Sequence, residues 1–239
     1  MDTAQRYMPQ ASNTFKGAWE NLYRRLAYDI WRRELKRFST RRAQDSLKIA
    51  DVGCGPGFLL SCISKWYPQA ELTGVDQSDA LLEVARSRCK GLVTLKGDAA
   101  SALPLEDQSV DAMFALHVVE HLVDPMKFLR EAHRALLPGG MLVVATPNLE
   151  GWGAKIMKEK WMGYKDPTHI QLHGPQFWRE ALGQAGFDIA RDGTTGLSGI
   201  SWLSKMPLIL VHWIPTFFAG YYSWERGEAY IAIGIRKGK

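Results

Sequence analysis

The sequence contains few cysteines, and their spacing matches neither a disulfide pattern nor a metal-binding pattern. Only Cys54, Cys62 and Cys89 carry a thiol among the 239 residues. The number is odd and no Cys-x-x-Cys pair occurs, so neither a disulfide framework nor a zinc ribbon is expected. The N-terminus starts with polar residues and lacks the apolar core of a signal peptide. We therefore expect a cytoplasmic location.

The sequence also lacks internal repeats and low-complexity tracts. Charged residues make up 23% of the chain and hydrophobic residues 46%, which suffices for one sizeable core. We expect one main domain at 47–239, preceded by a helical cap at 1–46. Insertions in the main domain are expected at 148–174 and 197–224, where the regular pattern is lost.

Positive charge is concentrated near the N-terminus. Residues 16–48 contain ten Lys and Arg against four Asp and Glu, a balance of +6, whereas the whole chain carries +5. Apolar residues recur at helical spacing between 15 and 43, which predicts one or two amphipathic helices. The charges then form either the solvated face of these helices or a contact with an anionic membrane surface or acidic partner.

Apolar segments with strand and helix character alternate from residue 47 onward. The expected strands are 47–53, 71–76, 92–98, 110–122 (its end running into a loop), 140–147, 187–195 and 228–237. The expected helices are 58–68, 78–89, 125–137 and 174–186, with Ser78 as an N-cap and Pro138 ending the third. This alternation is typical of an α/β fold, a mostly parallel sheet with helices on both faces.

A glycine-rich turn, DVGCGPG, joins the first strand to the first helix of this pattern. Gly53, Gly55 and Gly57 allow the backbone angles of a tight turn and the close approach of a ligand. Asp76 ends the next strand, where a carboxylate can accept hydrogen bonds from the two hydroxyls of a nucleoside ribose.

The spacing of the glycines distinguishes between two nucleoside ligands. The dinucleotide fingerprint is G-x-G-x-x-G, whereas this turn has G-x-G-x-G and places Phe58 at the position of the last glycine. Asp51 at the start of the turn also suits a ligand with an ammonium group, which NAD lacks in that part. The pattern therefore favours S-adenosylmethionine over NAD.

With these features, the segment from about 47 to 147 resembles the class I S-adenosylmethionine-dependent methyltransferases. IADVGCGPG, GVD at 74–76, GDA at 97–99 and LPGGMLVVATPN are similar to the motifs of that superfamily. The resemblance implies a Rossmann-like sheet of seven strands whose last strand, EAYIAIGIRK, is antiparallel. It also implies the residues that hold the donor: Asp51, Gly53, Cys54, Gly55, Gly57, Asp76, Gln77, Asp98, Ala99 and His117.

Two further segments, 116–140 and 166–187, resemble the broad group that includes the ubiquinone-biosynthesis O-methyltransferases. This resemblance implies O-methylation of an apolar or aromatic small molecule, with S-adenosylhomocysteine as product. Methylation of RNA or protein is an alternative, although no nucleic-acid module or aromatic–basic stacking motif occurs. A non-catalytic partner that only binds the donor is another.

Three roles are open for the histidines after the fourth expected strand. His117 and His121 are candidates for the general base, since the pKa of histidine lies near neutrality. In a second interpretation, His117 packs over the donor and His121 caps a helix. In a third interpretation Glu120 and His121 belong to an acid-x-x-Glu-His metal motif that some related enzymes carry. His117 replaces the acid of that motif, so we assign no metal ligand.

The acceptor side of the site is expected in the two insertions. Trp161, Tyr164 and His169 are the candidate substrate contacts in the first. The second contains an almost uncharged apolar stretch, 197–220, interrupted by Pro207 and Pro215, which argues against a membrane span. It is interpreted as a lid over an apolar acceptor, a membrane-surface anchor, or a dimer or core element.

Overall fold

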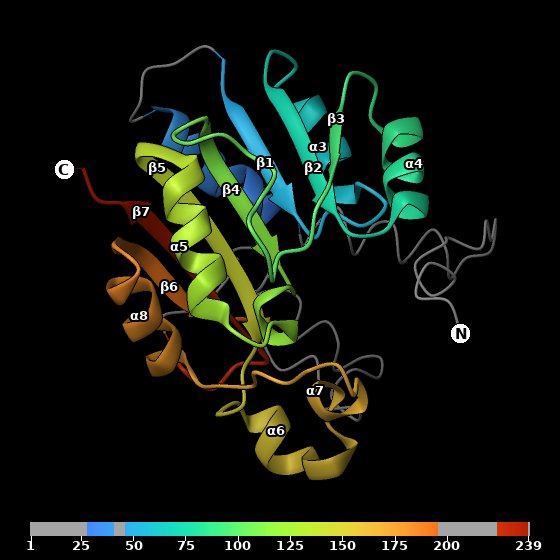
Figure 1. The fold of residues 1–239 in the computed structure, drawn as a ribbon. Helices are drawn as coiled ribbons and strands as arrows, with labels where there is room; N and C mark the ends of the chain where they lie inside the picture. The colour runs from blue at the N-terminus through green and yellow to red at the C-terminus, as the bar shows by residue number, and fades with distance from the viewer. Residues whose placement is uncertain (1–27, 41–45, 196–223, 239) are drawn as a thin grey trace.

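The computed structural model describes residues 28–40, 46–195 and 224–238, and a seven-stranded sheet runs through them (Figure 1). The strand order is β3-β2-β1-β4-β5-β7-β6. The strands are β1 (Lys48–Val52), β2 (Glu71–Asp76), β3 (Val93–Lys96), β4 (Val110–Leu116), β5 (Leu136–Pro147), β6 (Phe187–Thr194) and β7 (Ala229–Arg236).

The strand directions confirm the predicted Rossmann-like sheet. Strands β1 to β5 pair in parallel, while β7 is antiparallel to both of its neighbours, β5 and β6. The chain moves outward from β1 to β3 on one side and from β4 to β6 on the other, after which β7 returns to lie between β5 and β6. The strand order therefore reverses between β1 and β4, and open α/β sheets bind ligands outside the carboxyl ends of the strands at such a point.

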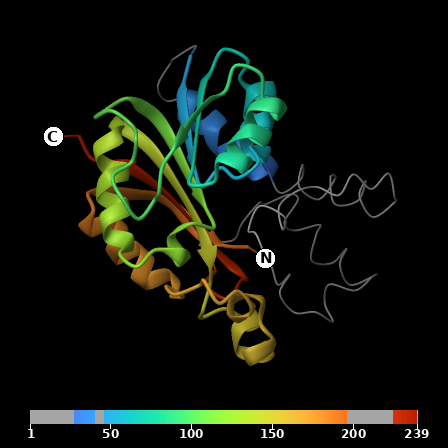
Figure 2. The same cartoon turned by 45° about the vertical axis from the view of Figure 1, so that its right-hand side comes forward.

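Helices cover both faces of the sheet (Figure 2). Their bounds are 28–40, α3 (Phe58–Trp66), α4 (Asp79–Arg88), α5 (Pro125–Ala135) and α8 (Pro175–Gln184). Phe128 of α5 and Trp178 of α8 are fully buried in one core cluster, and Leu60 of α3 lies in the other. Ser78 caps α4 as predicted, because its hydroxyl accepts a hydrogen bond from the Leu81 backbone N–H.

The helix at 28–40 accounts for part of the basic N-terminal segment. Leu35 and Trp31 are buried in the core, and the Trp31 ring meets Phe114 of β4 edge-on at 6.2 Å. Arg32 and Arg37 lie on the opposite side, with about half of each side chain exposed. Within this stretch the charges thus form the solvated face of a helix that covers the sheet. The rest of 1–46, apart from residue 46, lies outside the described residues.

The boundary between α5 and β5 differs from the prediction. The helix was expected to end at Pro138, but it ends at Ala135, and β5 begins immediately at Leu136. Leu136 pairs with Val110, after which the register shifts before Met141 pairs with Ala112. The residues 138–140 therefore form an irregular first part of the strand, where Gly139 has a φ of 72°.

After β5 the chain forms a helical insertion at the carboxyl end of the sheet (Figure 1). It contains α6 (Trp152–Met157), η2 (Lys158–Lys160) and α7 (Met162–Lys165). The fully buried Asn148 anchors its start, since its side-chain amide donates to the carbonyls of Glu225 and Gly227, each at 2.9 Å.

Most of the second expected insertion, the stretch 197–220 included, lies outside the described residues. Among the helices that the structure does describe, none has the length and apolar character needed to cross a membrane.

Candidate active site

The turn after β1 depends on glycine at two points of close approach. Gly53 and Gly57 have φ values of 70° and 71°, which residues with a Cβ rarely adopt. A Cβ on Gly53 would lie 2.5 Å from Cγ2 of Val118, and one on Gly57 would lie 2.9 Å from Cβ of Ala85. These glycines therefore let the turn pack against the end of β4 and let α3 pack against α4.

Gly55 lies in the same turn but faces open space. Its φ is 50°, and no atom would lie within 4 Å of a Cβ at this position. Its backbone N–H donates to Oδ2 of Asp76 at 2.8 Å, and the Ser78 N–H donates to Oδ1 of the same carboxylate at 2.9 Å. The two bonds fix the Asp76 carboxylate beside the open space, and each oxygen keeps a lone pair for a ribose hydroxyl.

This geometry explains the shortened glycine spacing. In the dinucleotide fingerprint the last glycine provides close helix packing. Here Gly57 makes that approach to α4, so the next position can hold a large side chain. Phe58 is half-buried, and the guanidinium of Arg88 lies 3.9 Å from its ring centroid.

The other expected donor residues lie at the same edge of the sheet. Gln77 follows β2 and Asp98 follows β3, and both are exposed. Asp98 Oδ1 accepts the backbone N–H of Ala100 at 2.9 Å, which fixes the short turn that also contains Ala99. Their position at the carboxyl ends of β2 and β3 leaves them accessible to the base of a nucleoside whose ribose lies at Asp76.

Asp51 is a buried acid behind the turn. Only 4% of it is exposed. Burial, and then the charge of Asp76, raise the pKa of Asp51 to about 8. Burial likewise raises the pKa of the neighbouring Cys54 thiol above its usual range, with further contributions from Asp51 and Asp76. Cys54 therefore stays a neutral packing group, while Asp51 can become a carboxylate when a cation lies beside it.

We expect donor binding to release a proton from Asp51. A bound ammonium group would favour the carboxylate, so affinity for S-adenosylhomocysteine should rise by up to about tenfold per pH unit until about pH 8. Calorimetry in buffers of different ionisation enthalpy measures the proton directly. D51N should bind with little pH dependence, and an equally steep dependence in D51N would contradict this role.

The same residue affects the stability of the unliganded fold in the opposite direction. The Asp51 carboxyl ionises near 3.8 in its ordinary environment and near 8 in the fold. Its contribution to the free energy of unfolding therefore decreases as the pH rises through that interval.

His117 follows β4 in a backbone conformation that is uncommon for residues other than glycine. Its φ is 57°, and its N–H donates to the Ala145 carbonyl of β5 at 2.8 Å. The side chain is 57% exposed, with Nδ1 lying 3.1 Å from Oε1 of the fully buried Glu120. Loss of solvation on the side facing the protein lowers the pKa of His117, but the hydrogen bond and charge of Glu120 outweigh it and raise the pKa overall.

Glu120 also connects β4 to the segment at 166–173, which the sequence does not reveal. Its carbonyl accepts the backbone N–H groups of Ile170 and Gln171, both at 2.9 Å. Nδ1 of His121 lies 2.9 Å from the Thr168 hydroxyl, and the His121 and His169 rings lie 4.7 Å apart. His121 thus contacts this segment, whereas the His117 side chain is largely exposed and contacts Glu120.

The side chains of Glu120, His121 and His169 lie close enough together to ligate a divalent cation. One ligand atom of each lies within 4.8 Å of the others. Oε2 of Glu120 is buried and has no hydrogen-bond partner among the described residues. Carboxylate and imidazole ligands suit several divalent metals. His117, which replaces the acid of the metal motif, is not part of this set.

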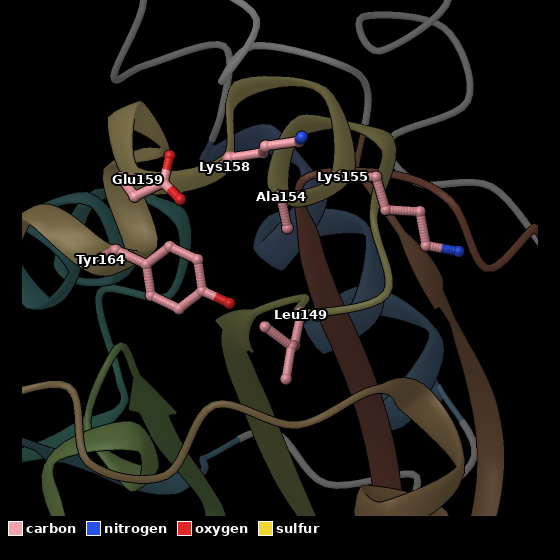
Figure 3. Close-up of a pocket in the computed structure, with 6 residues that line it drawn as sticks. All are labelled: Leu149, Ala154, Lys155, Lys158, Glu159 and Tyr164. Atoms are coloured by element: carbon pink, nitrogen blue, oxygen red, sulfur yellow. The ribbon is translucent and has the colours of Figure 1, made fainter.

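The structure separates the two aromatic candidates of the insertion. Trp161 is fully buried, its indole N–H donates to Glu228, and its ring meets Tyr164 at 5.2 Å. Such surroundings are those of a core residue. Tyr164 is 50% exposed and lines an open hollow of about 680 Å³, with its hydroxyl directed toward Leu149 and Ala154 (Figure 3).

His169 connects the insertion that lines the hollow with the segment that follows β4. Nδ1 of His169 lies 2.7 Å from the carbonyl of Gly163 in α7, and its ring lies against His121. Lys155 and Lys158 also line the hollow (Figure 3). The helical insertion therefore provides a mixed apolar and basic surface near the end of β4.

The fold and this edge of the sheet define a Rossmann-like protein with a fixed carboxylate, Asp76, beside an open glycine turn. Residues 50–144 match the family model of the methyltransferase domain. The resemblance to S-adenosylmethionine-dependent methyltransferases is thereby confirmed.

Known relatives and structures agree with this assignment. Trans-aconitate 2-methyltransferase of Rhodopseudomonas palustris is 32% identical over 145 residues, 59% of this chain and 50% of the relative. Ubiquinone biosynthesis O-methyltransferase of Ruegeria pomeroyi is 34% identical over 112 residues, 46% of this chain and 44% of the relative. A methyltransferase structure from Archaeoglobus fulgidus has a TM-score of 0.63 at 19% identity, covering 93% of this chain and all of that one.

The chain spans about half the length of these two curated relatives. The structural match lies at an identity that supports the fold alone. The two relatives are also named for different acceptors, so their names do not indicate which acceptor this chain uses.

Proposed function

We propose that this protein is an S-adenosylmethionine-dependent methyltransferase that methylates a hydroxyl on an apolar or aromatic small molecule. The observation that carries the proposal is the open space at Gly55, bounded by the fixed carboxylate of Asp76. A nucleoside ribose fits this arrangement, and the methyltransferase domain at 50–144 makes the adenosyl sulfonium donor its preferred source.

In the proposed reaction the donor supplies a methyl group that is activated by the positive sulfonium. Asp76 would hold the ribose of the donor, Asp51 would neutralise its ammonium group, and Asp98 would lie beside its adenine base. These contacts fix the donor so that a hydroxyl oxygen can approach the methyl carbon in line with the C–S bond. The new O–C bond forms as the C–S bond breaks, and the hydroxyl proton must leave.

His117 is the group we assign to that proton. Glu120 accepts a hydrogen bond from Nδ1 of His117, so the other ring nitrogen is free to accept a proton from the acceptor hydroxyl. His121 was an equal candidate from the sequence. Its Nδ1 contacts Thr168, so we assign it to positioning the segment at 166–173.

The acceptor would occupy the hollow beside α6 and α7. Leu149, Ala154 and the Tyr164 ring offer apolar contacts, and Tyr164 adds a hydroxyl. His169 ties this surface to the end of β4. An aromatic acceptor carrying a hydroxyl fits the combination of ring contact and polar tip.

The test is transfer of a labelled methyl group. The full chain is incubated with methyl-labelled S-adenosylmethionine and separate panels of catechols, hydroquinones, small carboxylic acids, RNA and protein. The proposal expects label in the hydroxylated aromatic panel. Label confined to carboxylic acids or macromolecules would overturn the acceptor class. Binding of S-adenosylhomocysteine without transfer to any panel would favour a non-catalytic partner.

A further inference from the structure

Exposed apolar side chains concentrate at one end of the described part of the molecule. The described part of the molecule has eight exposed large hydrophobic residues. Seven of them lie in segments that follow the carboxyl ends of strands, or in a helix that begins at that end of the sheet. They are Val123, Trp152, Ile156, Met162, Tyr164, Ile170 and Phe177. The eighth, Val93, begins β3 at the opposite end. Scattered exposed apolar residues are ordinary, but a concentration at one end indicates a contact surface.

The helical insertion combines these side chains with positive charge. Residues 152–165 contain four lysines and a single acid, Glu159, a balance of +3. All four lysines are exposed, and none forms an ion pair with another described residue. They are Lys155, Lys158, Lys160 and Lys165.

We propose that this insertion docks on an anionic lipid bilayer. The docking surface, here called the insertion surface, consists of Trp152, Ile156, Met162 and Tyr164 with the four lysines. Tryptophan and tyrosine suit the boundary between water and lipid, and lysine can keep its ammonium at the headgroups while its methylenes lie on apolar surface. Anionic headgroups attract lysines at the surface.

A membrane fits this composition better than a protein partner does. Lysine is depleted in the core of protein interfaces, whereas here lysines alternate with apolar residues along the same short segment. The surface also adjoins the hollow lined by Leu149 and Tyr164, so an apolar acceptor could enter from the bilayer. This last link rests on the proposed function, while vesicle binding itself does not.

Vesicle flotation tests the proposal. The full chain is mixed with vesicles of phosphatidylcholine alone, or of phosphatidylcholine and phosphatidylglycerol in equal parts. We expect binding to the anionic vesicles that weakens with added salt, and much weaker binding to the neutral ones. K155Q/K158Q should weaken anionic binding by roughly 25-fold, about fivefold for each lysine. I156S/M162S should weaken it as well.

Matched controls lie elsewhere on the surface. K90Q removes a lysine and V93S an exposed apolar residue away from the insertion, and both should bind vesicles like the wild type. Equal losses in the controls, or no preference for anionic vesicles, would overturn the proposal. So would concentration-dependent dimerisation without lipid that I156S/M162S abolishes, because the surface would then fit a second copy of the chain.

Measuring S-adenosylhomocysteine binding in the same preparations separates this proposal from the proposed function. Variants of the insertion surface should keep wild-type affinity for the nucleoside while they lose the vesicles. A wild type that binds vesicles but not the nucleoside would refute the methyltransferase function alone.

Discussion

Replacement of Asp76 by alanine is expected to weaken binding of S-adenosylhomocysteine by about 100-fold to 10,000-fold. The carboxylate would accept hydrogen bonds from two ribose hydroxyls, and hydrogen bonds to charged groups contribute about 1.5–3 kcal/mol each. The substitution also removes the acceptor of the Gly55 and Ser78 backbone N–H groups, so the turn loses its fixed geometry. Calorimetric titration of both proteins measures the difference.

Asp79 provides the matched control for this experiment. It lies three residues further along, at the exposed start of α4, and pairs with Lys96. D79A removes a carboxylate of the same kind without touching the turn, so its affinity should stay close to that of the wild type. A loss of affinity in D79A as large as in D76A would show that general electrostatics, and not the ribose contact, explains the result.

The second large effect is expected from His117→Asn, with whichever acceptor the transfer screen identifies. Loss of a general base commonly slows turnover by about 100-fold to 10,000-fold. Asparagine tolerates the positive φ at this position better than most residues, so the backbone should be retained. Turnover should fall while affinity for S-adenosylhomocysteine changes little. Both quantities are measured on the same protein.

Two further variants show whether His117 acts as the proton acceptor. Glu120→Gln keeps a hydrogen-bonding group beside Nδ1 but removes the charge, so turnover should fall less than in His117→Asn. His121→Asn should act mainly through the position of the 166–173 segment and raise KM for the acceptor. Wild-type turnover in His117→Asn would remove the base assignment.

The regular part of the fold could be predicted because local pattern and tertiary structure agree there. Buried runs such as 71–76 and the helix signals at Ser78 and Pro125 specify elements whatever their neighbours are. The number of strands and the reversed β7 came from the resemblance alone, and the order of the strands was not predicted. Pairing between distant segments, such as Pro147 with Ala229, leaves no local trace in the sequence.

The insertion after β5 was harder to predict because its helices are short. Helices α6 and α7 have six and four residues, too few to show a helical period. For the same reason the sequence could not show which aromatic residue is buried. Trp161 packs in the core and Tyr164 lines the hollow, although both are aromatic and three positions apart.

The candidate site shows a similar division. The glycine turn and Asp76 are neighbours across adjacent strands, so motif and strand position together locate them. Glu120 and His169 are 49 positions apart and meet only because the segment at 166–173 packs on the end of β4. The spacing of His117 and Glu120, three positions apart after a strand, was the one local signal for their contact.

The central claim is that Asp76 and the open turn at Gly55 bind an adenosyl compound, and calorimetry on the full chain tests it most directly. S-adenosylhomocysteine is titrated into the protein near pH 8, with NAD as the comparison ligand. We expect saturable heat with S-adenosylhomocysteine, loss of that heat in D76A, and none with NAD. Folded protein that gives no heat with S-adenosylhomocysteine, or equal heat with NAD, would contradict the account.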